Sequence, residues 1–183
     1  ELYEAWEVAR RARRQFRGGR VVDVAGGHGV LAALMLLLDR ASPEAIVVDP
    51  AIPPSAAAVR RALVDAWPDL DRRLRLHQGP LDSFTLEAAD VIVSCHACGA
   101  LTDRVLEAAT RVRARVAVLP CCHDAGTCDA GPLRGWMDFS LAVDTMRAQR
   151  LAAAGADVRT QTIPESITPK NRLLMAQWRD AVL

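Results

Sequence analysis

The chain has 183 residues, 51% of them hydrophobic and 25% charged, which is enough to bury one sizeable core and excludes the polar, highly charged composition of disordered chains. Its formal net charge of +1 neither requires nor excludes a nucleic-acid partner, and Lys170 is the only lysine, so the positive charge is almost entirely arginine. Five cysteines, an odd number, disfavour a disulfide framework and predict thiols that are buried, metal-bound or reactive.

The sequence predicts neither a membrane segment nor a secretory signal. The longest apolar run, residues 30–38, is far shorter than the roughly 20 residues that span a bilayer. A signal peptide would need a charged start and a cleavage site, and neither is recognisable. We therefore expect a cytoplasmic protein with no membrane partner. Because the chain begins at Glu1 and not at a methionine, we also expect native sequence before it.

Hydrophobic spacing predicts alternating helices and strands along the whole chain. The first helix, within residues 1–17, should pack on the core through a face made of Leu2, Trp6, Ala9, Ala12 and Phe16. Strands are expected at 20–25, 45–49, 73–78, 90–95 and 115–121, with helices at 30–39, 56–67 and 102–113, the last with Thr102 as its N-cap.

The end of the chain departs from this alternation. Residues 156–164 and 172–178 are two strand-like runs joined only by a loop, so they should pair antiparallel. The preceding strands, each followed by a helix, should be parallel. The sequence therefore predicts a single α/β domain over residues 1–183, with a Rossmann-like, mostly parallel seven-stranded sheet, a C-terminal antiparallel hairpin and helices on both faces.

A glycine-rich turn, VVDVAGGHGVLAA, follows the first strand and opens a helix, which is the context of a nucleotide-binding loop. Gly26, Gly27 and Gly29 allow the backbone to approach a ligand closely, and the start of the helix offers free N–H groups. Gly27 to Ala32 fits the dinucleotide pattern G-x-G-x-x-A, and Asp49 lies 20 residues beyond Gly29, where an acid binds a ribose hydroxyl. Both NAD and S-adenosylmethionine (SAM) fit this pattern.

Two features favour SAM over a dinucleotide. Asp23 lies inside the strand just before the loop, where a carboxylate can hold the amino group of SAM but would repel a pyrophosphate. The antiparallel hairpin expected at the end of the chain is the second feature.

The motifs resemble those of a known family. VVDVAGGHG resembles motif I of the class I SAM-dependent methyltransferases, with Ala25 where the first glycine usually falls, and VVDP resembles their acidic motif II. SCHACGALTD and LPCCHD together resemble a methyltransferase-domain family with His-x-Cys after strand four and Cys-Cys-His after strand five. That family includes eukaryotic transfer-RNA 2'-O-methyltransferases and little-characterised bacterial proteins. The zinc fingers of the transfer-RNA enzymes are absent here, so their substrate is not carried over.

The resemblance implies roles for the residues around the loop. Asp23 and residues 25–29 would hold the methionine part of SAM, and Asp49 would bind both ribose hydroxyls. Pro50 would line the adenine on one side, with Leu81 and Asp82 on the other. The full implied cofactor set is Asp23, Ala25, Gly26, Gly27, His28, Gly29, Asp49, Pro50, Leu81, Asp82, Ser94 and Cys95.

Two cysteine and histidine turns follow the fourth and fifth strands, and they should be neighbours because the carboxyl ends of adjacent parallel strands line one crevice. Three interpretations compete. Cys95, Cys98, Cys121 and His123 could bind zinc. A cysteine could attack a pyrimidine ring, as in RNA cytosine-5 methyltransferases. The interpretation we favour has no metal: the cysteines line the pocket, and a nearby base handles the proton of the acceptor. The candidate catalytic residues are His96, Asp103, Cys121, Cys122 and His123.

The sequence thus predicts a SAM-dependent methyltransferase that acts on a nucleophilic oxygen or nitrogen of an RNA or small-molecule acceptor. The alternative is a SAM-binding or regulatory module without turnover. Six arginines between Arg10 and Arg20 could steer a polyanion or simply be solvated, and an aromatic content of 4% disfavours a stacking platform for single-stranded RNA. Trp136 and Met137 could cover the acceptor or begin the core face of a helix.

Overall fold

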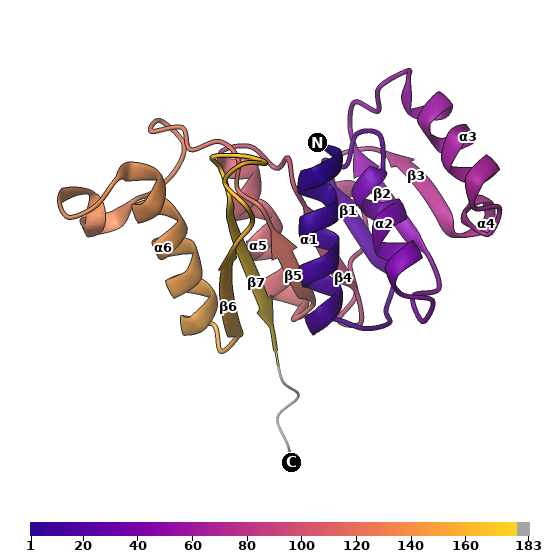
Figure 1. Cartoon of the computed structure of the whole chain (residues 1–183). Coiled ribbons are helices and arrows are strands. Elements are labelled where there is room, and N and C mark those ends of the chain that lie inside the picture. The colour runs from indigo at the N-terminus through magenta and orange to yellow at the C-terminus, as the bar shows by residue number, and fades with distance from the viewer. Residues whose placement is uncertain (179–183) are drawn as a thin grey trace, which may run out of the picture.

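A computed structural model describes residues 1–178 and contains one seven-stranded sheet with the order β3-β2-β1-β4-β5-β7-β6 (Figure 1). Strands β1 to β5 are parallel, and β7 runs antiparallel to both β5 and β6. The predicted fold is therefore confirmed, including the terminal hairpin. The strands are β1 Val21–Val24, β2 Ala45–Asp49, β3 Leu74–Gln78, β4 Val91–Ser94, β5 Arg115–Val118, β6 Asp157–Thr162 and β7 Arg172–Gln177.

Helices cover both faces of this sheet, as Figure 1 shows. The helices are α1 Leu2–Gln15, α2 Val30–Leu38, α3 Ala56–Ala66, α4 Leu70–Arg73, α5 Ala100–Val112 and α6 Phe139–Ala153, with short 3-10 turns η1 Leu81–Ser83 and η2 Gly131–Gly135. Among residues 1–178, no helix is both long and apolar enough to cross a bilayer.

The core has two layers because successive residues of a strand point to opposite faces of the sheet. On β1, Val21 packs with α1 and α2, whereas Val22 packs with α5 on the other face. A third, smaller cluster holds η2 against the first turns of α6. This lobe projects from the β6 side of the sheet in Figure 1.

Helix α1 packs on α2 through a face that includes the predicted Ala9, Ala12 and Phe16 but has Ala5 and Val8 in place of the predicted Leu2 and Trp6. Its buried apolar side is made of Ala5, Val8, Ala9, Ala12 and Phe16. Leu2 and Trp6, which the sequence assigned to that side, are 59% and 41% exposed. The small alanines allow α1 to lie close to α2, and this leaves the bulky residues at its start on the surface.

Thr102 is not the N-cap of α5, contrary to the prediction. The helix begins two residues earlier, at Ala100, after Gly99, whose φ of 57° favours glycine. Thr102 lies inside the first turn, fully buried, and its hydroxyl donates to the carbonyl of Ala97. Its side chain therefore stabilises the turn after β4 through this hydrogen bond and does not cap a backbone N–H.

Candidate functional site

The glycine-rich turn at the end of β1 has a backbone that few side chains tolerate. Gly27 and Gly29 have φ angles of 49° and 75°, and Ala25 has a φ of 55° although it carries a Cβ. A Cβ on Gly26 would lie 2.6 Å from the carboxyl group of Asp23. The loop therefore leaves space above Asp23 only because position 26 is glycine.

Asp23 is buried, with 1% exposure, and points to the face of the sheet covered by α2. Its Oδ2 accepts the N–H of Ala32 at 3.1 Å, so the carboxyl group caps the first turn of α2. Burial, and to a lesser extent the charge of Asp49, raises the pKa of Asp23 to about 7, although the bond from Ala32 acts in the opposite direction. Asp23 therefore lacks a cationic partner among the described residues.

Asp49 ends β2 beside the same loop. Its Oδ2 accepts the N–H of Gly27 at 3.0 Å and its Oδ1 accepts the N–H of Ala51 at 2.8 Å. Each carboxylate oxygen keeps a second acceptor direction, so both remain able to accept hydroxyl donors. The carbonyl of Asp49 also accepts the N–H of Gly79 at 3.1 Å, which ties the end of β2 to the end of β3.

The residues predicted around the adenine differ in exposure. Pro50 is exposed beside Asp49, and Leu81 is buried at 6% in η1. Asp82 is exposed and forms an ion pair with Arg104 of α5. The three residues lie after β2 and β3, at the edge of the sheet where the implied site requires them, with the carboxylate of Asp82 already paired.

A small hollow of about 30 Å³ lies between the β1 loop and the turn after β4. Glu1 and Ala5 of α1 also line it, and sequence reasoning missed both because nothing in their pattern indicates which neighbour α1 meets. The predicted residues that the structure brings together at this hollow are Asp23, Ala25, Gly26, His28, Cys95 and His96. His28 also bonds Ser55 through its Nε2, at 2.8 Å from the Oγ.

Ser94 and Cys95 hold the turn after β4 in place. The hydroxyl of Ser94 donates to the carbonyl of Val24 at 2.7 Å and accepts the N–H of Ala97 at 3.1 Å, so it joins the ends of β4 and β1. Cys95 is 4% exposed, and burial, followed by the charge of Asp23, raises the pKa of its thiol. This thiol remains protonated and lines the hollow.

The two cysteine and histidine turns meet, as predicted. The N–H of Gly99 donates to the carbonyl of Cys122 at 3.2 Å, and the Sγ atoms of Cys98 and Cys121 lie 3.0 Å apart. Burial and the neighbouring thiols raise the pKa of Cys121, and burial raises that of Cys98. Neither thiol has the lowered pKa of a cysteine nucleophile, which disfavours attack on a pyrimidine by these two residues.

The four zinc ligands considered from the sequence do not assemble. Among the described residues, the group with metal-ligand spacing is Cys98, Cys121 and Cys122, whose Sγ atoms all lie within 4.8 Å of one another. Cys95 is buried beside Asp23. The Nε2 of His123 lies 2.8 Å from Asp144 of α6, with the side chain only 3% exposed. The two turns were predicted correctly from the sequence, but the side chains that face one another within them were not.

Asp103 is held in an ion pair with Arg147 of α6. The Nε and Nη2 atoms of Arg147 donate to the two carboxylate oxygens of Asp103 at 3.0 and 2.7 Å. Arg147 is 1% exposed and also donates to Asp144 and to the carbonyl of Gly99. Burial lowers the pKa of Arg147, but the bond and charge of Asp103 outweigh it and raise the pKa. This geometry assigns Asp103 to the joint between α5 and α6, with both oxygens engaged.

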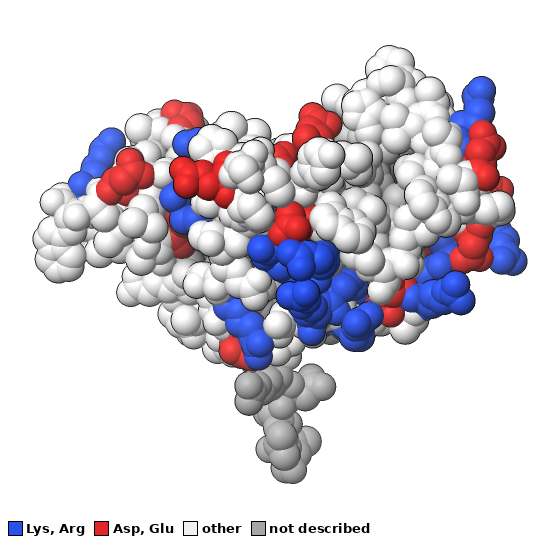
Figure 2. All heavy atoms as spheres, viewed as in Figure 1, with Lys and Arg blue, Asp and Glu red and all other residues white. Residues whose placement is uncertain are grey.

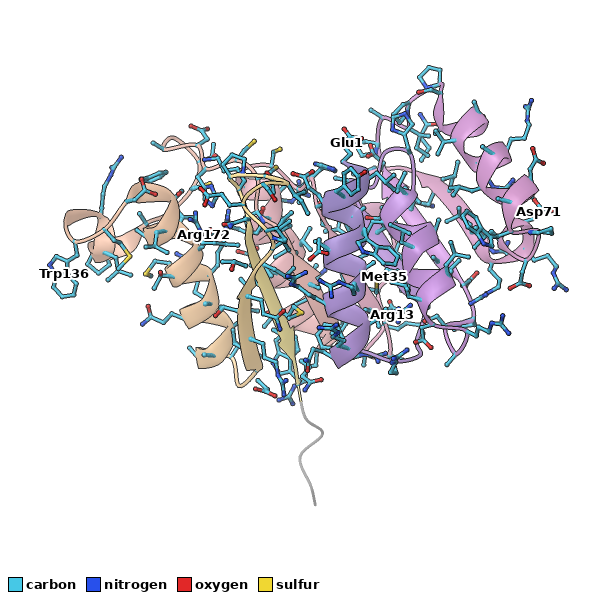
Figure 3. The ribbon with its side chains drawn as sticks, in the orientation of Figure 1. Glu1, Arg13, Met35, Asp71, Trp136 and Arg172 are labelled. Atoms are coloured by element: carbon cyan, nitrogen blue, oxygen red, sulfur yellow. The ribbon has the colours of Figure 1, made fainter. Side chains whose placement is uncertain are left out.

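Asp144 connects the same network to β7. Arg172 donates to its Oδ2 at 2.7 Å, whereas His123 binds its Oδ1. Burial acts to raise the pKa of Asp144, but the bonds from His123 and Arg172 outweigh it and lower the pKa. In contrast, Trp136 is 85% exposed at the far left end of the molecule in Figure 3, away from Glu1 near its centre. It therefore does not cover the hollow in this structure.

Comparison with known proteins places this site in a family. The sequence profile of a family described as a methyltransferase domain matches residues 3–127, more than half of the chain. A glutathione S-transferase C-terminal domain-containing protein homolog of Drosophila pseudoobscura pseudoobscura is 29% identical over 203 aligned positions, covering 88% of this chain and 33% of the relative.

Solved structures share the fold at low identity. An O-methyltransferase family protein of Burkholderia thailandensis superimposes with a TM-score of 0.61 at 20% identity, covering 98% of this chain and 55% of the other. The B. subtilis tRNA methyltransferase TrmK gives 0.59 at 16% identity, with 95% and 66% covered. The chain thus spans about a third of the curated relative and about half of the first structure. With the glycine loop, the acidic residues and the strand order together, this chain belongs to a methyltransferase-domain family and has the class I SAM-dependent methyltransferase fold.

Proposed function

We propose that this domain is a SAM-dependent methyltransferase that acts on a nucleophilic oxygen or nitrogen. The observation that carries the proposal is the placement of Asp23, the glycine turn and Asp49 at the carboxyl ends of β1 and β2. In parallel sheets with crossover helices, ligands bind at these ends.

The residues at this edge fit the cofactor. Asp23 is a buried carboxyl group with one backbone partner, and a ligand ammonium would supply the cation that it lacks. Gly26 leaves the space that a Cβ would fill against Asp23, and Asp49 can accept two ribose hydroxyls. Pro50 and Leu81 would flank the adenine. When bound, the cofactor supplies an electrophilic methyl group on a sulfonium.

His96 is the residue we propose to take the proton from the acceptor. It is exposed and lines the hollow that holds Asp23, on the side of the two cysteine turns. His123 is less suited to this role, because its Nε2 is bound to Asp144 and its side chain is buried. Cys121 and Cys122 would shape the acceptor side, and the main task of the protein would be alignment of the acceptor with the methyl group.

A surface of arginines and aromatic rings supports RNA over a small molecule as the acceptor. It consists of Tyr3, Trp6, Arg14, Arg17, Arg40 and Trp67, all exposed, and we call it the arginine–aromatic surface. Trp6, Arg40 and Trp67 line a cavity of about 920 Å³ between α1, α2 and α4. Figure 2 shows basic side chains gathered over the lower half of α1.

This surface has the chemistry of a nucleic-acid contact. Arg14 and Arg40 have no ion-pair partner within residues 1–178, and Arg17 donates only to the carbonyl of Leu38, at 3.4 Å. Free guanidinium groups bind phosphates, and although the aromatic content of 4% disfavours an extended stacking platform, Trp6 and Trp67 each offer one exposed indole ring for a base. Helix α1 begins at the hollow, and the basic residues lie at its other end. One RNA strand could therefore contact the hollow and the arginine–aromatic surface at once.

Calorimetry tests the cofactor half of the proposal. We expect SAM and its demethylated product to bind, NAD not to bind, and Asp49→Ala to weaken SAM binding at least about 10-fold, since the hydroxyl acceptors are lost. Binding of NAD without SAM would overturn the proposal.

Transfer of a labelled methyl group to fractionated cell extracts tests the acceptor half. We expect label in the RNA fraction, lost in His96→Ala while that variant keeps its affinity for SAM. Label in the small-molecule fraction would replace RNA as the acceptor class. SAM binding with no label in either fraction would instead identify a binding module without turnover.

A further inference from the structure

Three cysteines from two separate turns converge beside the proposed active site. Cys98 follows β4, and Cys121 and Cys122 follow β5, yet their Sγ atoms lie within 4.8 Å of one another. The ion-pair network around Asp144 and the SAM-binding residues described above use none of these thiols. Cys98 and Cys122 are exposed and Cys121 is partly exposed, so the group lies at the surface.

We propose that Cys98, Cys121 and Cys122 bind one zinc-like divalent ion through three thiolates, with a fourth position open to the outside. This set differs from the four ligands that the sequence suggested. Cys95 is buried at the hollow of Asp23 and lies outside the thiol group, as does His123, whose Nε2 is bound to Asp144.

The spacing of the three sulfurs suits such an ion. A tetrahedral zinc ion with Zn–S bonds of about 2.3 Å separates its sulfur ligands by about 3.8 Å. The Cys98 and Cys121 sulfurs are closer than this, at 3.0 Å, and all three lie within 4.8 Å, so small side-chain rotations are enough to seat an ion. Soft thiolates select zinc over calcium or magnesium.

The backbone holds both turns ready for this geometry. The N–H of Gly99 donates to the carbonyl of Cys122 at 3.2 Å, and the N–H of Leu119 donates to the carbonyl of Ser94 at 2.9 Å. These two bonds fix the Cys98 turn against the Cys121 and Cys122 turn on either side of the thiols. A site prepared in this way avoids the ordering cost that a flexible loop would incur on binding.

An ion accounts for the group better than a disulfide does. A bond between Cys98 and Cys121 would use two thiols and leave Cys122 unpaired beside it, whereas one ion engages all three. Sites with three protein ligands and an open position are typical of zinc that binds a water or a substrate atom. The open position would lie on the acceptor side, next to the turn that carries His96. This inference does not depend on methyl transfer.

Metal analysis of untagged protein, purified under reducing conditions and then dialysed against zinc, tests the proposal. We expect about one equivalent of zinc per chain, as for other protein zinc sites. Cys98→Ser, Cys121→Ser and Cys122→Ser should each weaken zinc binding by about 100-fold, because a neutral hydroxyl replaces a thiolate ligand. Cys128→Ser is the matched control, since Cys128 is buried in the α6 lobe, and it should keep the metal.

Cobalt substitution provides an independent readout. The Co²⁺ protein should show thiolate-to-metal charge-transfer bands in the near ultraviolet, weaker in each of the three variants but not in Cys128→Ser. Zinc below about a tenth of an equivalent would overturn the proposal, as would metal that persists in all three variants or a Cys98–Cys121 disulfide in the reduced preparation. SAM titration of the same samples separates the two proposals, because loss of zinc with intact SAM binding leaves the proposed function standing.

Discussion

At the scale of single residues, Asp23 combines two roles with opposite demands. It is a buried carboxyl group that caps α2 through Ala32, and it is the proposed partner of a ligand ammonium. Burial favours the protonated form in the free protein, whereas binding of a cation requires the ionised form. The position therefore costs stability at neutral pH in exchange for binding, a trade-off common at functional sites.

Asp23→Asn should remove the pH dependence that this residue causes. Because the pKa of Asp23 rises from 3.8 to about 7 on folding, the folded chain holds more protons than the unfolded chain between these values. The free energy of unfolding therefore falls as the pH rises through this window, by up to about 4 kcal/mol. The variant should be more stable than the wild type at about pH 8 and equal to it at about pH 4.

The affinity for SAM should change in the opposite sense. It should rise with pH through about 7 as Asp23 ionises, and Asp23→Asn should bind weakly without that rise. Asp49 acts on this carboxyl group and Glu1 and Cys95 line the same hollow, so the same titration in Cys95→Ala shows whether the thiol contributes. Denaturant unfolding and calorimetry at several pH values measure both effects. A wild-type affinity that does not vary with pH would contradict the assignment.

Ala25→Gly should stabilise the protein. Ala25 has a φ of 55°, where a Cβ costs about 1–2 kcal/mol, and glycine relieves this strain at the expense of a more flexible unfolded chain. We expect a net gain of about 0.5–1 kcal/mol in denaturant unfolding. Gly29→Ala is the opposite test, since its φ of 75° and a Cβ contact of 2.9 Å with Val47 should make it destabilising. A loss of stability in Ala25→Gly would show that the strain is absent.

At the scale of elements, Arg147 joins α6 to α5 and, through Asp144, to β7. Its buried guanidinium contacts Asp103, Asp144 and the carbonyl of Gly99. The network thereby sets the position of the α6 lobe relative to the turn that carries Cys98. A buried ion network of this kind specifies one arrangement of helices more than it adds net stability.

Arg147→Ala should destabilise the protein by about 2–3 kcal/mol, because it removes both close donors to the partly buried Asp103 and one of three partners of the buried Asp144, which keeps His123 and Arg172. Arg150→Ala, on the same helix, is the control: the side chain of Arg150 is 48% exposed and pairs with Asp129 and, at 3.9 Å, with Asp103, so its loss should cost less than about 1 kcal/mol. Denaturant unfolding measures both. Equal costs for the two variants would contradict the structural role of Arg147.

At the scale of the whole molecule, the orientation of α1 about its own axis creates the arginine–aromatic surface. Because α1 buries its alanines, and Phe16 just after it is also buried, Tyr3, Trp6 and Arg14 of the helix and Arg17 after it are exposed, as are Arg40 and Trp67. Arg13, by contrast, is buried and donates to the carbonyl of Met35 and to Ser42, so it takes no part in the surface. The arginine cluster of the sequence thus divides into four ion-paired members, Arg10, Arg11, Arg13 and Arg20, and two solvent-facing members, Arg14 and Arg17.

Replacing Arg14, Arg17 and Arg40 together with glutamine should weaken RNA binding. The slope of log K for RNA against log salt concentration should become shallower by about 2–3. The control replaces Arg61, Arg111 and Arg113, which are exposed, lie outside the arginine–aromatic surface and change the net charge equally. Filter binding over a range of salt concentrations gives the slopes. Identical losses in both triple variants would show that net charge, and not this surface, attracts RNA.

The sequence alone determined the order of elements, the parallel sheet with its antiparallel hairpin, and the acidic and glycine residues at the ends of β1 and β2. These features follow from local periodicity and from spacing within short motifs, which neighbouring residues decide. Only the tertiary structure decided that Thr102 stabilises the turn after β4 and that Asp103 pairs with Arg147. It also decided how α1 is oriented, with Trp6 exposed and Glu1 at the hollow. It also selected Cys98, Cys121 and Cys122 from the six cysteine and histidine candidates. Such pairings depend on the rotation of helices and the direction of side chains across strands, which residues far apart in the sequence set together through packing.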